Sequence, residues 1–242
     1  MYTLSAVYWC YKNKNATEKV LKAFRSSYPM NMVLLISDCG DDVSELAERY
    51  ACTYVYCKEN LKVGTGSHDV ELGLRGILQH LEYIKTYITT THCLVLEDDV
   101  IVLKPYNLDG CIDAINGELI NQFGVPQLGI TPRFYSGHGG SIYNVQQLME
   151  VYDNKLAVSQ LIDYHRKYMR LVAGDLFLSM LIALNGRTVG SLPGSYSYKH
   201  DRDLEHDIAK WLSSDSPPSG KINEYITRGI CTLHPFKLFY SR

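Results

Sequence analysis

Three consecutive acidic residues, Glu97, Asp98 and Asp99, directly follow the apolar run 93–96. Neighbouring carboxylates repel one another, and burying them without partners would be more unfavourable still. A divalent cation removes this problem, since Mg²⁺ and Mn²⁺ take oxygen ligands and usually bridge one or two carboxylates to a substrate's phosphates. In an extended chain Glu97 and Asp99 project to one side and Asp98 to the other. The cluster therefore indicates a cation site, with a solvated acidic loop as the alternative.

Alternating strands and helices in the first half of the chain must position this cluster. Apolar runs predict strands over 3–11, 32–37, 53–57 and 93–96, and helical spacing predicts helices from Thr17, over 43–50 and over 72–87. A turn is expected over 13–15, with Thr17 as the N-cap of the first helix. Strands separated by such helices form parallel sheets, whose ligands bind beyond the carboxyl ends of the strands. We therefore expect an α/β, Rossmann-like, mostly parallel sheet flanked by helices.

The second half of the chain is less regular. Its patterns predict a strand over 128–131, helices over 145–152, 156–168 and 176–184, a strand over 188–192 and a loop over 213–220. We expect one domain over residues 1–242. It would consist of a nucleotide-binding half (1–103), a smaller mixed acceptor-side and catalytic half (104–212) and a C-terminal extension (213–242).

The acidic cluster and its strand resemble the GT-A glycosyltransferases. The stretch Cys93-Leu94-Val95-Leu96-Glu97-Asp98-Asp99-Val100 is similar to the Asp-X-Asp-like signature that follows a hydrophobic strand in that family. The resemblance implies that Asp99 is the main direct metal ligand, and that Glu97 holds the metal through water or binds the ribose. It places Asp98 nearer the donor sugar. The first acid is Glu rather than Asp, which departs from the usual signature.

A second resemblance lies downstream, in Gly174-Asp175-Leu176-Phe177-Leu178-Ser179, which is followed by a strand-like run and a histidine. It implies that Asp175 is the general base of an inverting enzyme, whereas the residue types alone also allow a helix N-cap. His200 would be the third protein ligand of the metal. The competing candidate is His234, with Lys237 on the diphosphate. For His200 the alternative is a surface histidine, and for His234 and Lys237 it is a plain C-terminal strand. The resemblance covers roughly residues 3 to 200.

The donor nucleotide needs contacts for its base, ribose and diphosphate. Tyr8, Trp9 and Tyr11, near the end of the first predicted strand, are candidates for the base, although they could equally be core aromatics. The resemblance implies that Asp38, at the end of the second strand, binds uracil or ribose. Arg75 is a candidate counter-charge for the diphosphate, with a solvated helix face as the alternative.

A glycine-rich turn over 137–140 resembles the family segment that lies beside the donor sugar and acceptor. Gly139 and Gly140 would let the backbone approach a sugar closely. No Gly-Lys-Ser/Thr sequence follows, so the turn is not a nucleoside-triphosphate P-loop.

Composition narrows the function further. The 242 residues carry a net charge of −2, so no basic excess favours nucleic-acid binding. No apolar run near 18 residues predicts a membrane span. The seven cysteines are odd in number and form no Cys-X-X-Cys pair, which favours reduced thiols and a cytoplasmic, soluble protein.

The sequence therefore predicts a hexosyl- or pentosyltransferase. It would use Mn²⁺ or Mg²⁺ and move a sugar from a nucleoside diphosphate, with UDP as the expected nucleotide, to a glycan hydroxyl. One alternative is a sugar-phosphate nucleotidyltransferase, which would carry a glycine-rich loop after the first strand, where residues 10–14 contain no glycine. A second alternative is a non-catalytic nucleotide- or carbohydrate-binding module.

Overall fold

The computed structural model describes residues 3–63, 67–98, 100–108, 115–116, 124–132, 139–187, 190–191, 194–196, 202–214 and 216–233. Within these residues a seven-stranded sheet has the order β3-β2-β1-β4-β7-β6-β8. Its strands are β1 (Leu4–Cys10), β2 (Val33–Ser37), β3 (Thr53–Tyr56), β4 (His92–Leu96), β6 (Ile115–Asn116), β7 (Ile142–Asn144) and β8 (Gly190–Ser191). The first four in spatial order are parallel, whereas β7 runs antiparallel to both of its neighbours.

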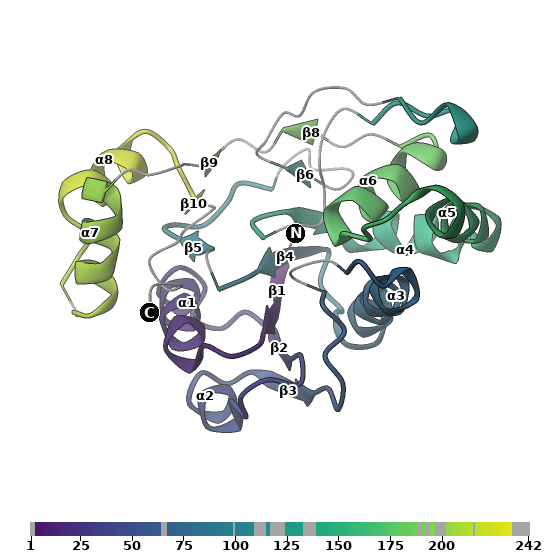
Figure 1. Cartoon of the computed structure of the whole chain (residues 1–242). Coiled ribbons are helices and arrows are strands. Elements are labelled where there is room, and N and C mark those ends of the chain that lie inside the picture. The colour runs from purple at the N-terminus through teal and green to yellow at the C-terminus, as the bar shows by residue number, and fades with distance from the viewer. Residues whose placement is uncertain are drawn as a thin grey trace.

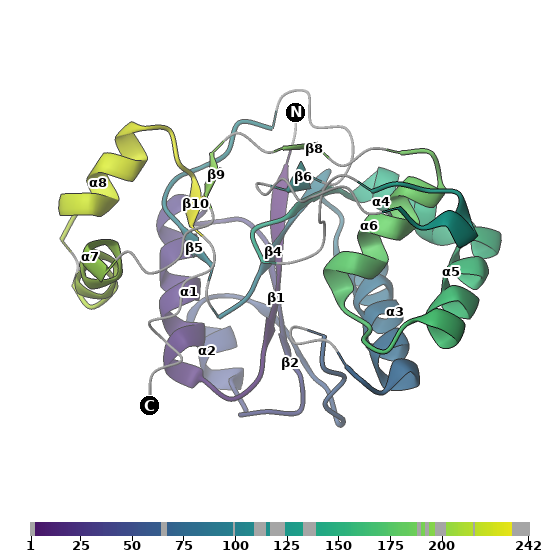
Figure 2. The same cartoon turned by 45° about the horizontal axis from the view of Figure 1, so that its top comes forward.

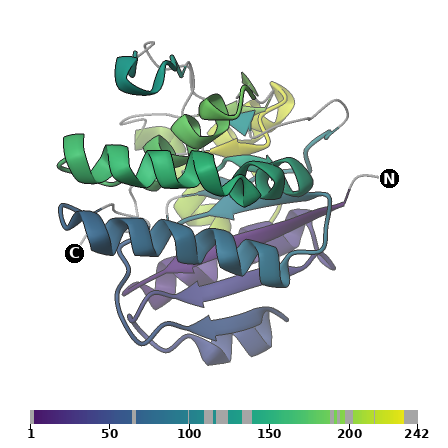
Figure 3. The same cartoon turned by 90° about the vertical axis from the view of Figure 1, so that its right-hand side faces the viewer.

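Helices cover both faces of the sheet (Figure 1). One face carries α3 (Val70–Tyr87), α4 (Val145–Asp153), α5 (Lys155–Tyr168) and α6 (Gly174–Leu184), and Figure 3 shows this layer in front of the strands. The other face carries α1 (Lys14–Ser27), α2 (Ser44–Arg49) and α7 (Arg202–Leu212), with α8 (Gly220–Thr227) packed on α7. Successive side chains of β1 point to opposite faces of the sheet, so Tyr8 lies in one apolar core and Trp9 in the other. Because both faces are covered by helices, every residue of β1 is buried.

A second, three-stranded sheet lies beside the first (Figure 2). It consists of β5 (Ile101–Val102), β10 (Thr232–Leu233) and β9 (Ser195–Tyr196), with β10 in the middle. The chain therefore leaves the main sheet soon after β4, and a segment from near the C-terminus pairs with the residues that follow the acidic cluster. The three-part division of the chain expected from the sequence stays a prediction.

Two of the expected local structures are wrong. Helix α1 begins at Lys14, inside the expected turn, because Asn13 is the N-cap and its side chain accepts from the Ala16 backbone N–H at 3.0 Å. Thr17 lies inside the helix and donates its hydroxyl to the Asn13 carbonyl. No strand forms over 128–131, because Leu128 ends the 3₁₀ helix η1 (Pro126–Leu128), Gly129 has a φ of 66°, and Ile130 forms only an isolated bridge with Val125. The other expected helices and the four N-terminal strands are confirmed to within two residues at most ends.

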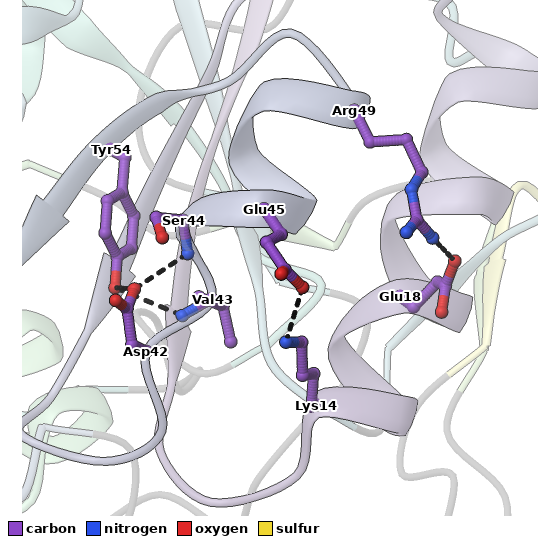
Figure 4. A network of polar contacts seen from close by, with 8 residues as sticks. All are labelled: Lys14, Glu18, Asp42, Val43, Ser44, Glu45, Arg49 and Tyr54. Carbon is purple, nitrogen blue, oxygen red and sulfur yellow. Dashed lines mark hydrogen bonds and ion pairs between the residues drawn. The ribbon is translucent and has the colours of Figure 1, made fainter.

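Exposed polar contacts join α1, α2 and β3 at the surface (Figure 4). Lys14 pairs with Glu45 at 3.0 Å, and Arg49 pairs with Glu18 at 2.5 Å. Asp42 accepts from the backbone N–H two residues on, at the start of α2, and from a tyrosine hydroxyl of β3. Each exposed ion pair contributes at most about 1 kcal/mol, so the buried cores and not these pairs hold the helices on the sheet.

Within the described part of the chain, no helix combines the length and the apolar character that crossing a membrane requires. The described cysteines, six of the seven, carry free thiols. Burial raises the pKa of Cys10 and of Cys93 to about 12, so both stay protonated and behave as small apolar core residues.

Candidate active site

The acidic cluster lies at the carboxyl end of β4, in the middle of the sheet. Glu97 and Asp98 directly follow the strand and are both half-buried. Because side chains alternate along a strand, Asp98 lies on the side of Tyr8 and α1, whereas Glu97 lies on the side of Trp9 and α3. Asp99 lies outside the described residues, and its role as metal ligand stays a prediction.

Asp98 is held by a buried tyrosine. The Tyr8 hydroxyl donates to Oδ1 of Asp98 at 2.6 Å, and the Tyr8 side chain is fully buried. Burial, and after it the negative charge of Asp98, raises the pKa of Tyr8 well above its ordinary value. Tyr8 therefore stays protonated and keeps donating, which fixes one oxygen of Asp98 beneath the end of β1.

Glu97 packs against the glycine turn. A Cβ added at Gly139 would lie 2.4 Å from Cγ2 of Val100 and 3.1 Å from the Glu97 carboxyl group, so only glycine fits there. Gly140 has a φ of 86° and donates its N–H to the Val95 carbonyl at 2.8 Å, which ties the turn to β4. The structure thus brings together Gly139, Gly140 and the acidic cluster, which sequence reasoning assigned to one donor-sugar region.

Asp175 approaches the same region from α6. The helix begins at Gly174 with Ala173 as its N-cap, so the N-cap alternative for Asp175 is wrong. Asp175 lies in the first helical turn, where its Oδ1 accepts from the Leu176 N–H at 2.7 Å. A carboxylate is favourable there because the first turn of a helix carries partial positive charge.

A buried tyrosine lies on the Glu97 side of the sheet. Tyr143, on β7, is fully buried, and its hydroxyl has no hydrogen-bond partner among the described residues. Burial raises the pKa of Tyr143 well above its ordinary value, and Cys93, Glu97 and Asp175 raise it further. The charges of Glu97 and Asp175 thus reach Tyr143, which lies in the core on the α3–α6 side of the sheet.

Asp38 fixes the loop that follows β3. It is 6% exposed, and its two carboxylate oxygens accept from the backbone N–H groups of Leu61 at 2.7 Å and Val63 at 3.4 Å. Burial raises the pKa of Asp38, and these hydrogen bonds oppose that shift. The structure gives this residue the role of anchoring a loop, and its contact with uracil or ribose stays a prediction.

The loops before α3 and α6 are joined at the same edge of the sheet. Ser67 and Val172 exchange two backbone hydrogen bonds of 2.9 Å, which form an isolated antiparallel bridge. A Cβ at Gly73, in the first turn of α3, would lie 2.7 Å from Cβ of Val172. This close contact holds the starts of the two helices together around the candidate site.

The remaining candidates for the donor nucleotide lie in different surroundings. Tyr11 is 40% exposed in the loop after β1, with the Lys12 ammonium 5.1 Å from the centre of its ring. Arg75 lies on the exposed face of α3 and pairs with Glu59 at 2.6 Å. Trp9 is buried against α3. Among the three aromatic candidates, Tyr11 is therefore the one that presents its ring to solvent.

The predicted histidine ligands His200 and His234, and Lys237, lie outside the described residues. Within the part of the chain that the structure describes, no group of three or more His, Cys, Asp and Glu side chains is arranged to hold a metal ion. Of the four predicted metal ligands, Glu97 is the one that the structure describes, and Asp98, predicted nearer the donor sugar, is described beside it.

Sequence reasoning missed His80. It lies in the middle of α3, 4% exposed, and its Nδ1 accepts from the Trp9 indole N–H at 2.6 Å. The available signal was a histidine on the apolar face of the predicted helix, between Ile77 and Ile84. This histidine and Glu97 both line one partly enclosed cavity.

No protein-family model matches the chain, and no curated protein matches its sequence. Among solved structures, 230 chains match its fold. One is the galactosyltransferase LgtC in complex with donor and acceptor sugar analogs. The alignment covers 95% of this chain and 86% of that chain, with a TM-score of 0.53 and 11% sequence identity.

At this identity the likeness shows the fold alone, which is GT-A. The expected fold class is therefore confirmed, both by the match and by the strand order, in which a mostly parallel sheet carries the antiparallel strand β7 next to β4. The placement of the acidic cluster at the carboxyl end of a central strand follows from the structure of this chain itself.

Proposed function

We propose that the chain is a metal-dependent glycosyltransferase that moves a hexose or pentose from a nucleoside diphosphate, with UDP as the expected nucleotide, to a glycan hydroxyl. The observation that carries the proposal is the position of Glu97 and Asp98, which directly follow the central strand β4 at its carboxyl end. Support comes from the shared fold with a galactosyltransferase whose structure contains donor and acceptor sugar analogs.

The residues at the end of β4 suit a hard divalent cation. Glu97 and Asp98 offer carboxylate oxygens, and Asp99 follows them in the sequence. Mg²⁺ and Mn²⁺ need only one or two carboxylates when substrate phosphates complete the coordination shell, so a three-residue protein cage is not required. We assign the cation to Glu97 and Asp99, with His200 or His234 as a further ligand. When bound, the cation neutralises negative charge on the leaving diphosphate.

The chain's own residues hold this site in place before substrate arrives. Tyr8 fixes Asp98 from below, and the Gly139 turn limits where the Glu97 carboxyl group can lie. Asp38 anchors the loop after β3, and the bridge between Ser67 and Val172 joins the loops before α3 and α6, so the segments beside the site are also fixed. Such preorganisation favours transfer because the groups need little rearrangement as charge develops.

Asp175 is proposed as the general base. Its carboxylate would take the proton of the acceptor hydroxyl while that oxygen attacks the anomeric carbon from the side opposite the leaving diphosphate. This geometry inverts the configuration of the anomeric carbon. A product with retained configuration would assign another role to Asp175, and NMR of the product anomer distinguishes the two outcomes.

Donor turnover tests the proposal directly. Release of UDP from UDP-sugars is measured with and without Mn²⁺, for the wild type, for Asp99→Asn and for the surface control Asp153→Asn, whose side chain is 48% exposed. We expect turnover that requires the cation and that falls at least about 100-fold in Asp99→Asn but not in the control. A turnover rate that changes neither with EDTA nor in Asp99→Asn contradicts the role of the metal and of Asp99. Pyrophosphate release from a nucleoside triphosphate and sugar phosphate would instead identify a nucleotidyltransferase.

A further inference from the structure

The Trp9–His80 hydrogen bond fixes the chemical state of a buried histidine. An indole N–H can only donate, so Nδ1 of His80 must carry a lone pair. Burial lowers the pKa of His80 from its ordinary value of 6.5 to about 4, so the imidazole is neutral near pH 7. A neutral imidazole with a bare Nδ1 carries its proton on Nε2. His80 therefore presents an N–H donor on the side of its ring away from Nδ1.

This N–H donor has no acceptor among the described residues. Nε2 of His80 is fully buried and makes no hydrogen bond. A buried donor without a partner costs about 1–3 kcal/mol. Nearly all buried polar groups in proteins are satisfied, so an orphan donor of this kind calls for an explanation, such as a bound ligand group.

A cavity lies beside His80. Three half-buried residues form its rim, namely Val63 and Glu97 in two loops and Gly174 at the start of α6. Its floor is made by six buried residues, namely Trp9, Ile77, His80, Val95, Leu96 and Leu178. The cavity has a volume of about 20 Å³. That is room for one water molecule or one hydroxyl group.

The polar groups of the cavity select the chemistry of its occupant. His80 offers a hydrogen-bond donor, and Glu97 at the rim offers a carboxylate that accepts. The rest of the wall is apolar, apart from the Trp9 indole N–H, which His80 already engages. A hydroxyl group matches this pair because it accepts one hydrogen bond and donates another. A carboxylate group matches less well, because it has no proton to donate to Glu97.

We propose that His80 is a specificity-determining residue whose Nε2–H donates a hydrogen bond to one hydroxyl group of the transferred sugar, which enters the cavity past Glu97. The inference rests on the proposed function, because the sugar must be brought to the rim by its nucleoside diphosphate. It assigns the buried side of α3 to recognition of the sugar. A site built to bond a hydroxyl discriminates strongly against an occupant that lacks one.

Two substitutions of His80 test the roles of its two ring nitrogens separately. In His80→Asn the carboxamide oxygen can replace Nδ1 as the acceptor for Trp9, and no atom reaches the position of Nε2. In His80→Gln the carboxamide NH₂ can replace the Nε2–H donor, and Trp9 loses its acceptor. Calorimetric titrations of UDP, UDP-galactose and UDP-glucose in the presence of Mn²⁺ give the dissociation constants for the wild type and both variants.

We expect His80→Asn to weaken the binding of at least one UDP-sugar about tenfold, the usual effect of one lost hydrogen bond in a buried site, and to leave UDP within about twofold. His80→Gln should retain more of the sugar affinity. Equal losses in both variants, or an unchanged affinity in His80→Asn, overturn the inference while the proposed function stands. Wild-type protein that binds neither UDP nor either UDP-sugar overturns both.

A crystal structure of the wild type with Mn²⁺ and the tighter-binding UDP-sugar covers the case in which the variants fail to fold. The inference expects a sugar hydroxyl oxygen about 2.7–3.2 Å from Nε2 of His80. A water molecule at that position, with the sugar outside the cavity, identifies a buried water site and overturns the sugar assignment.

Discussion

The two sides of the sheet at the end of β4 differ in how their polar groups are satisfied. On the α1 side, Asp98 accepts a hydrogen bond from Tyr8. On the α3 side, Glu97 lines a cavity, and Nε2 of His80 and the hydroxyl of Tyr143 have no hydrogen-bond partner among the described residues. The two residues that follow β4 thus lie in different surroundings, with Asp98 hydrogen-bonded to a buried tyrosine and Glu97 lining a cavity. The difference suggests that the α1 side supports the site and that the α3 side receives the ligand.

The largest expected effect concerns the carboxylates of the α3 side. Glu97→Gln and Asp175→Asn keep the shape of each side chain and remove its charge, so we expect donor turnover to fall about 10²–10⁴-fold with little change in stability. Steady-state kinetics and thermal unfolding measure the two quantities. Full activity in Asp175→Asn would contradict its role as general base. An unchanged turnover in Glu97→Gln would show that Glu97 takes no part in the reaction.

The glycine turn tests how tightly Glu97 is positioned. In Gly139→Ala the new methyl group would overlap Val100 and press on the Glu97 carboxyl group. We expect a loss of about 1–3 kcal/mol in the free energy of unfolding and a drop of at least tenfold in turnover. Gly124→Ala is the matched control, because nothing lies within 4 Å of an added Cβ there. A Gly139→Ala protein as stable and active as this control would show that the turn does not constrain Glu97.

The buried histidine of the α3 side should make stability depend on pH. The pKa of His80 is lowered from 6.5 to about 4 in the folded protein, so the unfolded chain binds the proton first as the pH falls. The stability present above pH 6.5 is therefore lost as the pH falls toward 4, by up to about 3 kcal/mol. Urea unfolding of the wild type and of His80→Asn across this window measures the effect. Parallel pH profiles for the two proteins would contradict the neutral, buried state of His80.

The smallest expected effect concerns the α1 side. Tyr8→Phe removes the hydroxyl that Asp98 accepts from and should lower the free energy of unfolding by about 2 kcal/mol, since hydrogen bonds to charged groups are the stronger ones. The raised pKa of Tyr8 predicts a further loss of wild-type stability above pH 10, where the unfolded chain releases this proton first. The variant should lack that part of the alkaline loss. Turnover should fall less than in Glu97→Gln, and the reverse order would invert the roles of the two sides.

The fold was predictable from the sequence wherever apolar periodicity was strong. The strand at 93–96 and the helix at 72–87 carry clear patterns, and their order implied a parallel sheet with the acidic cluster at its carboxyl edge. Local chemistry was less decisive where two residues could serve the same purpose. Asn13 and Thr17 are both good N-caps, and only the position at which β1 ends selects Asn13.

The site was predictable in part. The acidic cluster, the glycine turn and Asp175 were identified from short motifs, and the structure brings those that it describes to one edge of the sheet. His80 could not be assigned from the sequence because its state depends on Trp9, 71 positions earlier in the chain. Asp38 was expected at a nucleotide, whereas its hydrogen bonds to the loop after β3 arise only from the folded arrangement.

The central claim is that the carboxylates following β4 bind a cation beneath a diphosphate. The most direct measurement is an anomalous difference map, recorded at the manganese absorption edge, from a crystal soaked with Mn²⁺ and UDP. The account predicts a peak about 2.0–2.2 Å from carboxylate oxygens of the segment 97–99, in contact with the diphosphate. A nucleotide bound with its manganese elsewhere, and no peak at these carboxylates, would contradict it.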